Sequence, residues 1–229
     1  PDTYTGELDL SSEAYLSLIT LGEMAFDEAD HAHLDAVYAS GIRATDERFG
    51  QLLQILDDNG RLDDQAIFIF GVDHGEEMYE HQDYFFHGCS VYNGVLKLNY
   101  AIKAPGLPSS HVVEKSISTT DIAPTVVELV GGLQHDASFA GQSLVDELTS
   151  GTQPDAPAFF ERGTESAGVV YDGYKYVLTP DEGFSGCTPF TSSSTSFSAE
   201  IEELYNLETD PGEQDNLADS APSELAELR

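Results

Sequence analysis

The apolar run at residues 66–72 is the feature that most limits what this chain can fold into. Its letters, AIFIFGV, include no charged residue, and the run ends abruptly at Asp73 and His74 before a turn at Gly75. A short, continuously apolar run is typical of a parallel strand that is covered on both faces. A helical pattern at about residues 33–60 precedes it, which completes half of a βαβ unit. The sequence therefore predicts an α/β fold with a mainly parallel central sheet flanked by helices.

The segments downstream extend this organisation. Residues 95–106 alternate apolar and polar side chains, which predicts a strand with one covered face, and residues 119–132 have the pattern of a short helix that exits at two glycines. An Asp-Gly pair between two β-rich runs predicts a hairpin within residues 168–179. We expect a main α/β portion at residues 1–150 and a small β-containing part at residues 151–229.

The charge balance of the chain is extreme. Lys and Arg number 9 against 42 Asp and Glu, a formal net charge of −33. Such a surface repels nucleic acid. It favours a folded protein from a high-salt environment, either a halophile's cytoplasm or the outside of a cell, because the Debye length falls to about 3 Å at molar salt. The chain begins with Pro1, and no apolar run is long enough to cross a bilayer, so we expect a soluble protein or an excised part of one.

Polar residues of one chemical kind gather directly after the apolar run. Asp73 and His74 end it, and His81 and His87 follow within fourteen residues. Carboxylates and neutral imidazoles are ligands of divalent cations, and the carboxyl ends of strands are where open α/β sheets bind their ligands. The alternative, one capping aspartate with three surface histidines, stays open because such residues are also common in turns.

Five segments resemble, in the same order, the landmarks of the sulfatase family within the alkaline phosphatase superfamily. The first includes the strand and its Asp-His-Gly-Glu, the second a His-Gly loop with a strand ending in Pro-Gly, and the third an Asp-x-x-Pro-Thr helix. The last two read GQSL and ELYNLETDPGEQDNLAD. They occupy residues 38–77, 87–106, 117–132, 141–144 and 203–219.

The resemblance implies an alkaline phosphatase-like fold, hydrolysis of sulfate esters, and a sulfated small molecule or glycan as substrate. Asp73 and His74 match the pair that ligates the divalent cation, which is usually Ca²⁺ in sulfatases. His87 matches a catalytic Lys or His that contacts the sulfate oxygens. Val72, where the family has Ser or Thr, and Asn206, where Asp is commoner, depart from the pattern without touching these ligands.

The resemblance also implies a missing half. The family's nucleophile is formylglycine, made from Cys or Ser in Cys/Ser-x-Pro-x-Arg, and it lies with two further acids well before the Asp-His strand. Before the Asp-His strand, the chain has neither the nucleophile motif nor the two further acids. Cys187-Thr188-Pro189 begins like the motif, but it lacks the Arg and follows the strand. We therefore expect the C-terminal portion of a sulfatase, whose partner is the N-terminal half of the same protein and which is inactive alone.

Two other functions remain open. A two-metal phosphodiesterase or phosphatase of the same superfamily, with Zn²⁺ or Mn²⁺, adds an Asp-x-x-x-His pair, and Asp27 and His31 have that spacing. A non-catalytic binding domain would keep the fold without the nucleophile. The pairing of Cys89 with Cys187 is also open, because neither lies in a Cys-x-x-Cys pattern.

Overall fold

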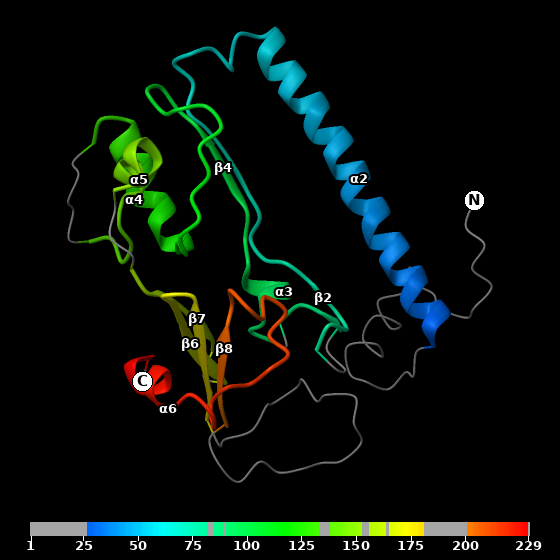
Figure 1. The fold of residues 1–229 in the computed structure, drawn as a ribbon. Helices are drawn as coiled ribbons and strands as arrows, with labels where there is room; N and C mark the ends of the chain where they lie inside the picture. The colour runs from blue at the N-terminus through cyan, green and yellow to red at the C-terminus, as the bar shows by residue number, and fades with distance from the viewer. Residues whose placement is uncertain are drawn as a thin grey trace. The chain divides into compact units, whose positions relative to one another are not determined.

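The computed structural model describes most of the chain after residue 26 (Figure 1). This part of the chain divides into two compact units. The described residues are 27–81, 85–88, 90–132, 138–152, 156–163, 165–180 and 201–228. Within them, the first unit takes residues up to 63 and 73–98, and the second takes 64–72 and those after 98. Cys187 and Cys89 lie outside the described residues, as does the segment that begins like a nucleophile motif.

The first unit begins with the long helix α2, Glu28–Asp58. Its N-cap is Asp27, whose carboxylate accepts hydrogen bonds from the backbone N–H groups of Ala29 and Asp30, while the Asp30 carboxylate accepts one from the Asp27 N–H. Its C-cap is Asn59, followed by a left-handed glycine. The predicted helix is confirmed, and it begins about one turn earlier than its apolar pattern indicates.

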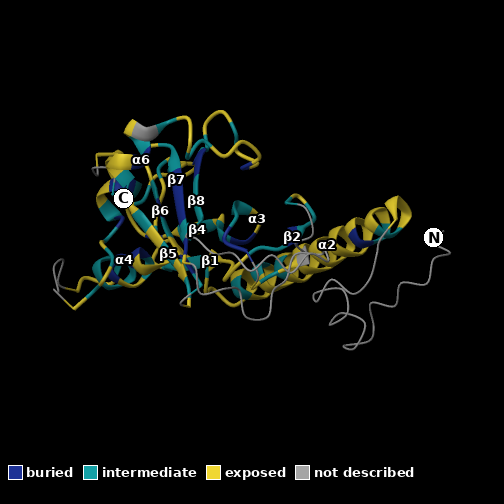
Figure 2. Cartoon of the chain, turned by 90° about the horizontal axis from the view of Figure 1, so that it is seen from below, coloured by how far each residue is buried: buried dark blue, intermediate teal, exposed yellow. Residues whose placement is uncertain are grey.

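Within the described residues, several large apolar side chains of α2 are exposed to solvent. Leu34 is the one buried residue of α2. Most of the surface of the helix is exposed (Figure 2). Five large apolar side chains are between 43% and 59% exposed: Val37, Tyr38, Ile42, Leu52 and Ile55. Because most helical stability in proteins comes from packing of an apolar face, a face this open is typical of a helix that packs on further protein.

The rest of the first unit is a small hairpin beside a single helical turn. Strand β2 (Glu77–Met78) pairs antiparallel with β3 (Phe85–Phe86), and α3 (Asn93–Leu96) lies against the loop that precedes them. The Gly75 N–H donates to the Val95 carbonyl at 2.8 Å. A Cβ atom at Gly75 would come within 2.1 Å of the Gly94 carbonyl oxygen, so only glycine permits this approach.

The second unit contains the apolar run, and there one prediction is wrong. Strand β1 (Phe68–Gly71) pairs antiparallel with β4 (Tyr100–Lys103), and Phe70 and Val72 are 39% and 40% exposed. All strand pairings in the described part of the chain are antiparallel, so the parallel, doubly covered strand is not found there. The physical reason is that apolar composition indicates a tendency to be buried but carries no information about the direction of the neighbouring strand.

The remainder of the second unit holds two short helices and a four-stranded sheet. The 3₁₀ turn η1 (Thr119–Asp121) leads into α4 (Ile122–Leu129), and α5 is Val145–Ser150. The antiparallel sheet has the order β5-β6-β7-β8 and is followed by α6. These elements span Ala158–Arg162, Ser166–Tyr171, Tyr174–Thr179, Ile201–Asn206 and Pro222–Leu228.

The core of this sheet is built by alternation along β6, β7 and β8. Val169, Tyr176 and Leu204 are buried together with Leu225 of α6. The predicted hairpin is confirmed: positive φ angles at Asp172 and Gly173, 49° and 76°, turn β6 into β7. The predicted division of the chain near residue 150 stays a prediction. In the described residues, no helix combines the length and apolar character that a membrane crossing requires.

The charge of the chain predicts a stability that depends on salt. We expect the melting temperature to rise when KCl is raised from about 0.1 M to about 1 M, because the Debye length falls from about 10 Å to about 3 Å and the repulsion among 42 acids weakens. Thermal unfolding followed by circular dichroism across this series measures the effect. A melting temperature that is independent of KCl and of NaCl would contradict it.

Candidate metal centre

The loop that follows β1 turns a carboxylate and an imidazole toward one another. The Asp73 side chain is 90% exposed, and one of its oxygens lies 3.8 Å from His74 Nε2. His74 Nδ1 lies 3.0 Å from the Gly75 carbonyl oxygen. Because a carbonyl only accepts, Nδ1 carries the proton there, and in the neutral ring Nε2 keeps a free lone pair. The two groups can thus bind one cation, since ligand atoms about 2.0–2.6 Å from an ion lie 3–4 Å apart.

His87 and Glu76 complete the cluster. The rings of His87 and His74 have centroids 4.1 Å apart, and His87 Nδ1 lies 2.9 and 3.2 Å from the two carboxylate oxygens of Glu76. One ligand atom from each of His74, Glu76 and His87 lies within 4.8 Å of the others. The structure brings together His74 and His87, which the sequence analysis singled out. The sequence analysis gave Glu76 no role.

The signal that points to Glu76 was present in the sequence. Glu76 lies two residues after His74, in the same loop and in the segment DHGEE. Its contact is with His87, eleven residues away along the chain, which the order of residues alone does not indicate. The β2–β3 pairing brings the two residues together in space, because it places their neighbours Glu77 and Phe86 opposite each other.

His81, the fourth candidate in the sequence, belongs to a different network. Its Nδ1 lies 3.3 Å from a carboxylate oxygen of Glu77, and its ring stacks on Tyr92 at 3.7 Å. Glu77 is only 1% exposed and also accepts a hydrogen bond from Ser90 Oγ at 3.2 Å. Buried polar groups of this kind hold a fold together when they are paired. His81 therefore pairs with the buried Glu77 of β2 and not with the other two histidines.

The ends of the hairpin have unusual backbone conformations. Tyr79 and Phe86 have φ angles of 69° and 77°, a region that residues other than glycine rarely adopt. Phe86 stacks on His87 with centroids 4.2 Å apart, and Tyr79 lies flat against His31 at 4.6 Å. Burial, with a smaller contribution from the charge of Asp30, raises the pKa of Tyr79 well above its ordinary value, so its hydroxyl stays neutral.

The spacing of Asp27 and His31, which fits a second metal, has a structural explanation instead. The Asp27 carboxylate already accepts two backbone hydrogen bonds at the start of α2, and the His31 ring packs on Tyr79. In the part of the chain that the structure describes, the one group of three or more metal-ligating side chains is the cluster of His74, Glu76 and His87. This observation weakens the two-metal alternative.

The chemistry of the cluster fits a divalent cation. With Asp73 beside it, the cluster of His74, Glu76 and His87 offers two carboxylates and two imidazoles, oxygen and nitrogen donors that suit Zn²⁺ and Mn²⁺. Ca²⁺ takes about six to eight oxygen ligands, so two carboxylates provide only part of a calcium shell. Asp73 and His74 therefore supply one carboxylate and one imidazole, which is part of the ligand set that a divalent cation requires.

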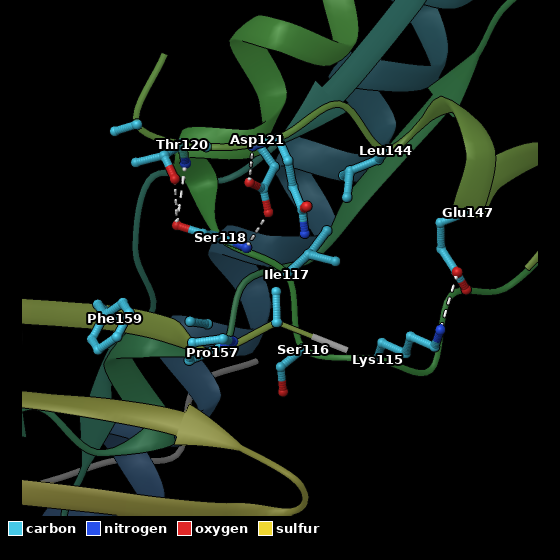
Figure 3. Close-up of a pocket in the computed structure, with 15 residues that line it drawn as sticks. Lys115, Ser116, Ile117, Ser118, Thr120, Asp121, Leu144, Glu147, Pro157 and Phe159 are labelled. Atoms are coloured by element: carbon cyan, nitrogen blue, oxygen red, sulfur yellow. Dashed lines mark hydrogen bonds and ion pairs between the residues drawn. The ribbon is translucent and has the colours of Figure 1, made fainter. Parts of the chain in front are cut away.

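A separate cavity of about 380 Å³ lies in the second unit (Figure 3). Lys115 lines it and lies 3.3 Å from Glu147, and the buried Asp121 carboxylate accepts hydrogen bonds from the backbone N–H groups of Ser118 and Gln142. These charged groups are thus occupied by one another or by the backbone. The cavity presents none of the histidines that the sequence singled out.

Comparisons with known proteins agree with one another. The family model described as Sulfatase matches residues 8–132, more than half of the chain. Arylsulfatase K of Xenopus laevis is 24% identical over 217 residues, which cover 89% of this chain and 37% of that protein. A solved 2-O GAG sulfatase has a TM-score of 0.69 at 22% identity and covers 94% of this chain and 44% of its own. The phosphonate monoester hydrolase of Agrobacterium radiobacter has a TM-score of 0.64 at 24% identity and covers 87% of this chain and 40% of its own.

These likenesses settle the fold. Structural neighbours with TM-scores of 0.69 confirm the predicted α/β, alkaline phosphatase-like architecture. The chain spans less than half the length of the relatives that it matches.

Proposed function

Because the chain belongs to the sulfatase family, we propose that it is the C-terminal portion of a sulfuric ester hydrolase and that it supplies part of a metal-dependent active site. The observation that carries this proposal is the convergence of Asp73, His74 and His87 in the first unit. These are the three residues that the resemblance marks as metal ligands and catalytic residue.

Each residue has a distinct role in this proposal. Asp73 and His74 hold the divalent cation, Ca²⁺ in a sulfatase, which acts as a Lewis acid and a template for the reacting groups. His87 Nε2 faces the sulfate oxygens, since its Nδ1 is held by Glu76. A cationic imidazole there stabilises the negative charge that gathers on the transferring group and the leaving oxygen.

The other part of the active site lies in further residues of the parent protein. We place the formylglycine nucleophile and the remaining metal ligands in its N-terminal half. Three facts support this: the chain corresponds to 37% of arylsulfatase K, α2 leaves its apolar side chains open, and β1 is half exposed. A high-salt setting for the parent protein is supported by the net charge of −33 alone.

The substrate we propose is a sulfated small molecule or glycan. One structural neighbour is a 2-O GAG sulfatase. A chain with a net charge of −33 repels an anionic sulfate ester, so the cation at Asp73 and His74 and the imidazolium of His87 would be the local positive charges that admit it.

One observation favours a second candidate. The phosphonate monoester hydrolase matches the fold nearly as well, and the imidazoles of the cluster suit Zn²⁺ or Mn²⁺. A phosphoesterase would use the same loop with a different metal.

The deciding experiment compares an aryl sulfate with an aryl phosphate as substrates of the full-length protein in high salt, with the bound metal counted by mass spectrometry. We expect the sulfate to be turned over faster, with one Ca²⁺ per protein, and no turnover by the 229-residue chain alone, because a metal without a nucleophile beside it does not complete the reaction. Phosphate preference with two bound zinc ions would identify a phosphoesterase. No turnover of either ester would indicate a non-catalytic binding domain.

A further inference from the structure

We propose that Glu76 is a positioning residue that fixes the tautomer and the orientation of the His87 imidazole, and that it is not a metal ligand. The inference rests on the proposed function, in which His87 faces the sulfate group. It is carried by the contact of both Glu76 carboxylate oxygens with His87 Nδ1, at 2.9 and 3.2 Å.

The chemistry of the contact selects one tautomer. A carboxylate only accepts hydrogen bonds, so the nitrogen that faces it must carry a proton. His87 Nδ1 therefore carries a proton both in the neutral ring and in the imidazolium, and Nε2 becomes the nitrogen that faces outward from the pair. In the imidazolium form the Nε2–H is the donor that meets the sulfate oxygens of the proposed function. Histidines in functional sites are commonly held in this way by a carboxylate on the far ring nitrogen.

The ring is also held in place by its neighbours. Phe86 stacks on His87 at 4.2 Å, and the His74 ring lies at 4.1 Å with a tilt of 35°. Glu76 and His87 are partly buried, with side chains 19% and 35% exposed. Partial burial strengthens a charge-assisted hydrogen bond relative to one in open water.

The same geometry argues against Glu76 as a ligand of the cation. Both of its oxygens lie on His87 Nδ1, so a cation bound by Glu76 would compete with the Nδ1–H for the same carboxylate, and the protonated Nδ1 itself has no lone pair for a metal. Asp73, in contrast, has an exposed carboxylate beside the free Nε2 of His74. The cluster thus divides into a metal-binding pair, Asp73 with His74, and a positioning pair, Glu76 with His87.

Glu76→Gln tests the positioning role with almost no change of shape. An amide can accept from Nδ1–H or donate to an unprotonated Nδ1, so it no longer selects a tautomer. In the full-length protein labelled with ¹⁵N at histidine, we expect the His87 signal to report protonated Nδ1 at about pH 8.5 and to shift toward the other tautomer in Glu76→Gln. The signal is assigned by its loss in His87→Gln. This readout does not depend on activity.

The kinetic test is a double-mutant cycle. We expect Glu76→Gln to lower kcat about 10–100-fold, with KM and bound metal unchanged, as for other residues that orient a functional histidine. In a His87→Lys background we expect the same substitution to change kcat less than about 3-fold, because an ammonium group has no ring to orient and no tautomer to select. Glu47→Gln, the same chemical change at an exposed position of α2, is the matched control and should leave every readout as in the unaltered protein.

The outcomes separate the two hypotheses. An unchanged His87 tautomer in Glu76→Gln overturns the positioning role whether or not the protein is a sulfatase. Loss of bound metal in Glu76→Gln with the tautomer unchanged identifies Glu76 as a ligand instead. A shifted tautomer in a protein without sulfatase activity upholds the pairing and overturns only the proposed function.

Discussion

Replacing Lys175 by Met is expected to lower the free energy of unfolding by about 3–5 kcal/mol, because it leaves the Glu213 carboxylate buried without its counter-charge. Lys175 Nζ lies 2.6 Å from Glu213 Oε1, and both side chains are 0% exposed. The ammonium group also lies 5.3 Å from the centre of the Phe160 ring. The pair ties the beginning of β7 to the segment that follows β8, so its loss disturbs both.

Urea unfolding at constant high salt measures this effect, since guanidinium would itself screen the acidic surface. Lys97→Met, which removes an exposed lysine, is the control and should change the free energy by no more than about 0.5 kcal/mol. The double variant Lys175→Met with Glu213→Leu should recover most of the loss, because a buried ion pair can be replaced by apolar groups at little net cost. If Lys175→Met costs no more than the control, the pair is not a determinant of stability.

Replacing His87 by Gln in the full-length protein is expected to lower kcat about 10²–10³-fold, as the loss of one charge-stabilising donor does in other enzymes. Glutamine is close in size to histidine but carries no positive charge, so sulfate oxygens lose their electrostatic partner in the transition state. Bound metal should stay unchanged in this variant. Asp73→Asn, in contrast, should lower both the bound metal and kcat.

Steady-state turnover of an aryl sulfate, together with metal analysis of each variant, distinguishes these roles. His111→Gln, at an exposed position in the second unit, is the control and should behave as the unaltered protein. Loss of metal in His87→Gln would make His87 a ligand, and full activity in that variant would remove it from the catalytic machinery.

Local chemistry explains what the sequence predicted correctly. Helix α2 follows from an apolar pattern with a period near 3.6 and from the Asn-Gly at its end, and the hairpin at Asp172 follows from the glycine beside it. The cap at Asp27 could also have been predicted, because Asp30 stands at the reciprocal position of a capping box. The Asp-x-x-x-His spacing of Asp27 and His31 also fits a second metal, so the sequence left that alternative open.

The order of landmarks along the chain was enough to identify the family, because each landmark is a short run of neighbouring residues. The candidate ligands Asp73 and His74 were found for the same reason, as adjacent residues after one apolar run. Their roles in metal binding stay predictions.

Tertiary structure alone decided three further features. The antiparallel partner of β1, the contact of Glu76 with His87 and the buried pair of Lys175 with Glu213 join residues that are far apart along the chain. Backbone propensity and hydrophobic period act over a few residues, so they determine which segments become helices, strands and turns. Which segments then meet depends on how their surfaces pack, and that is where the charges of Glu76 and Lys175 acquire their partners.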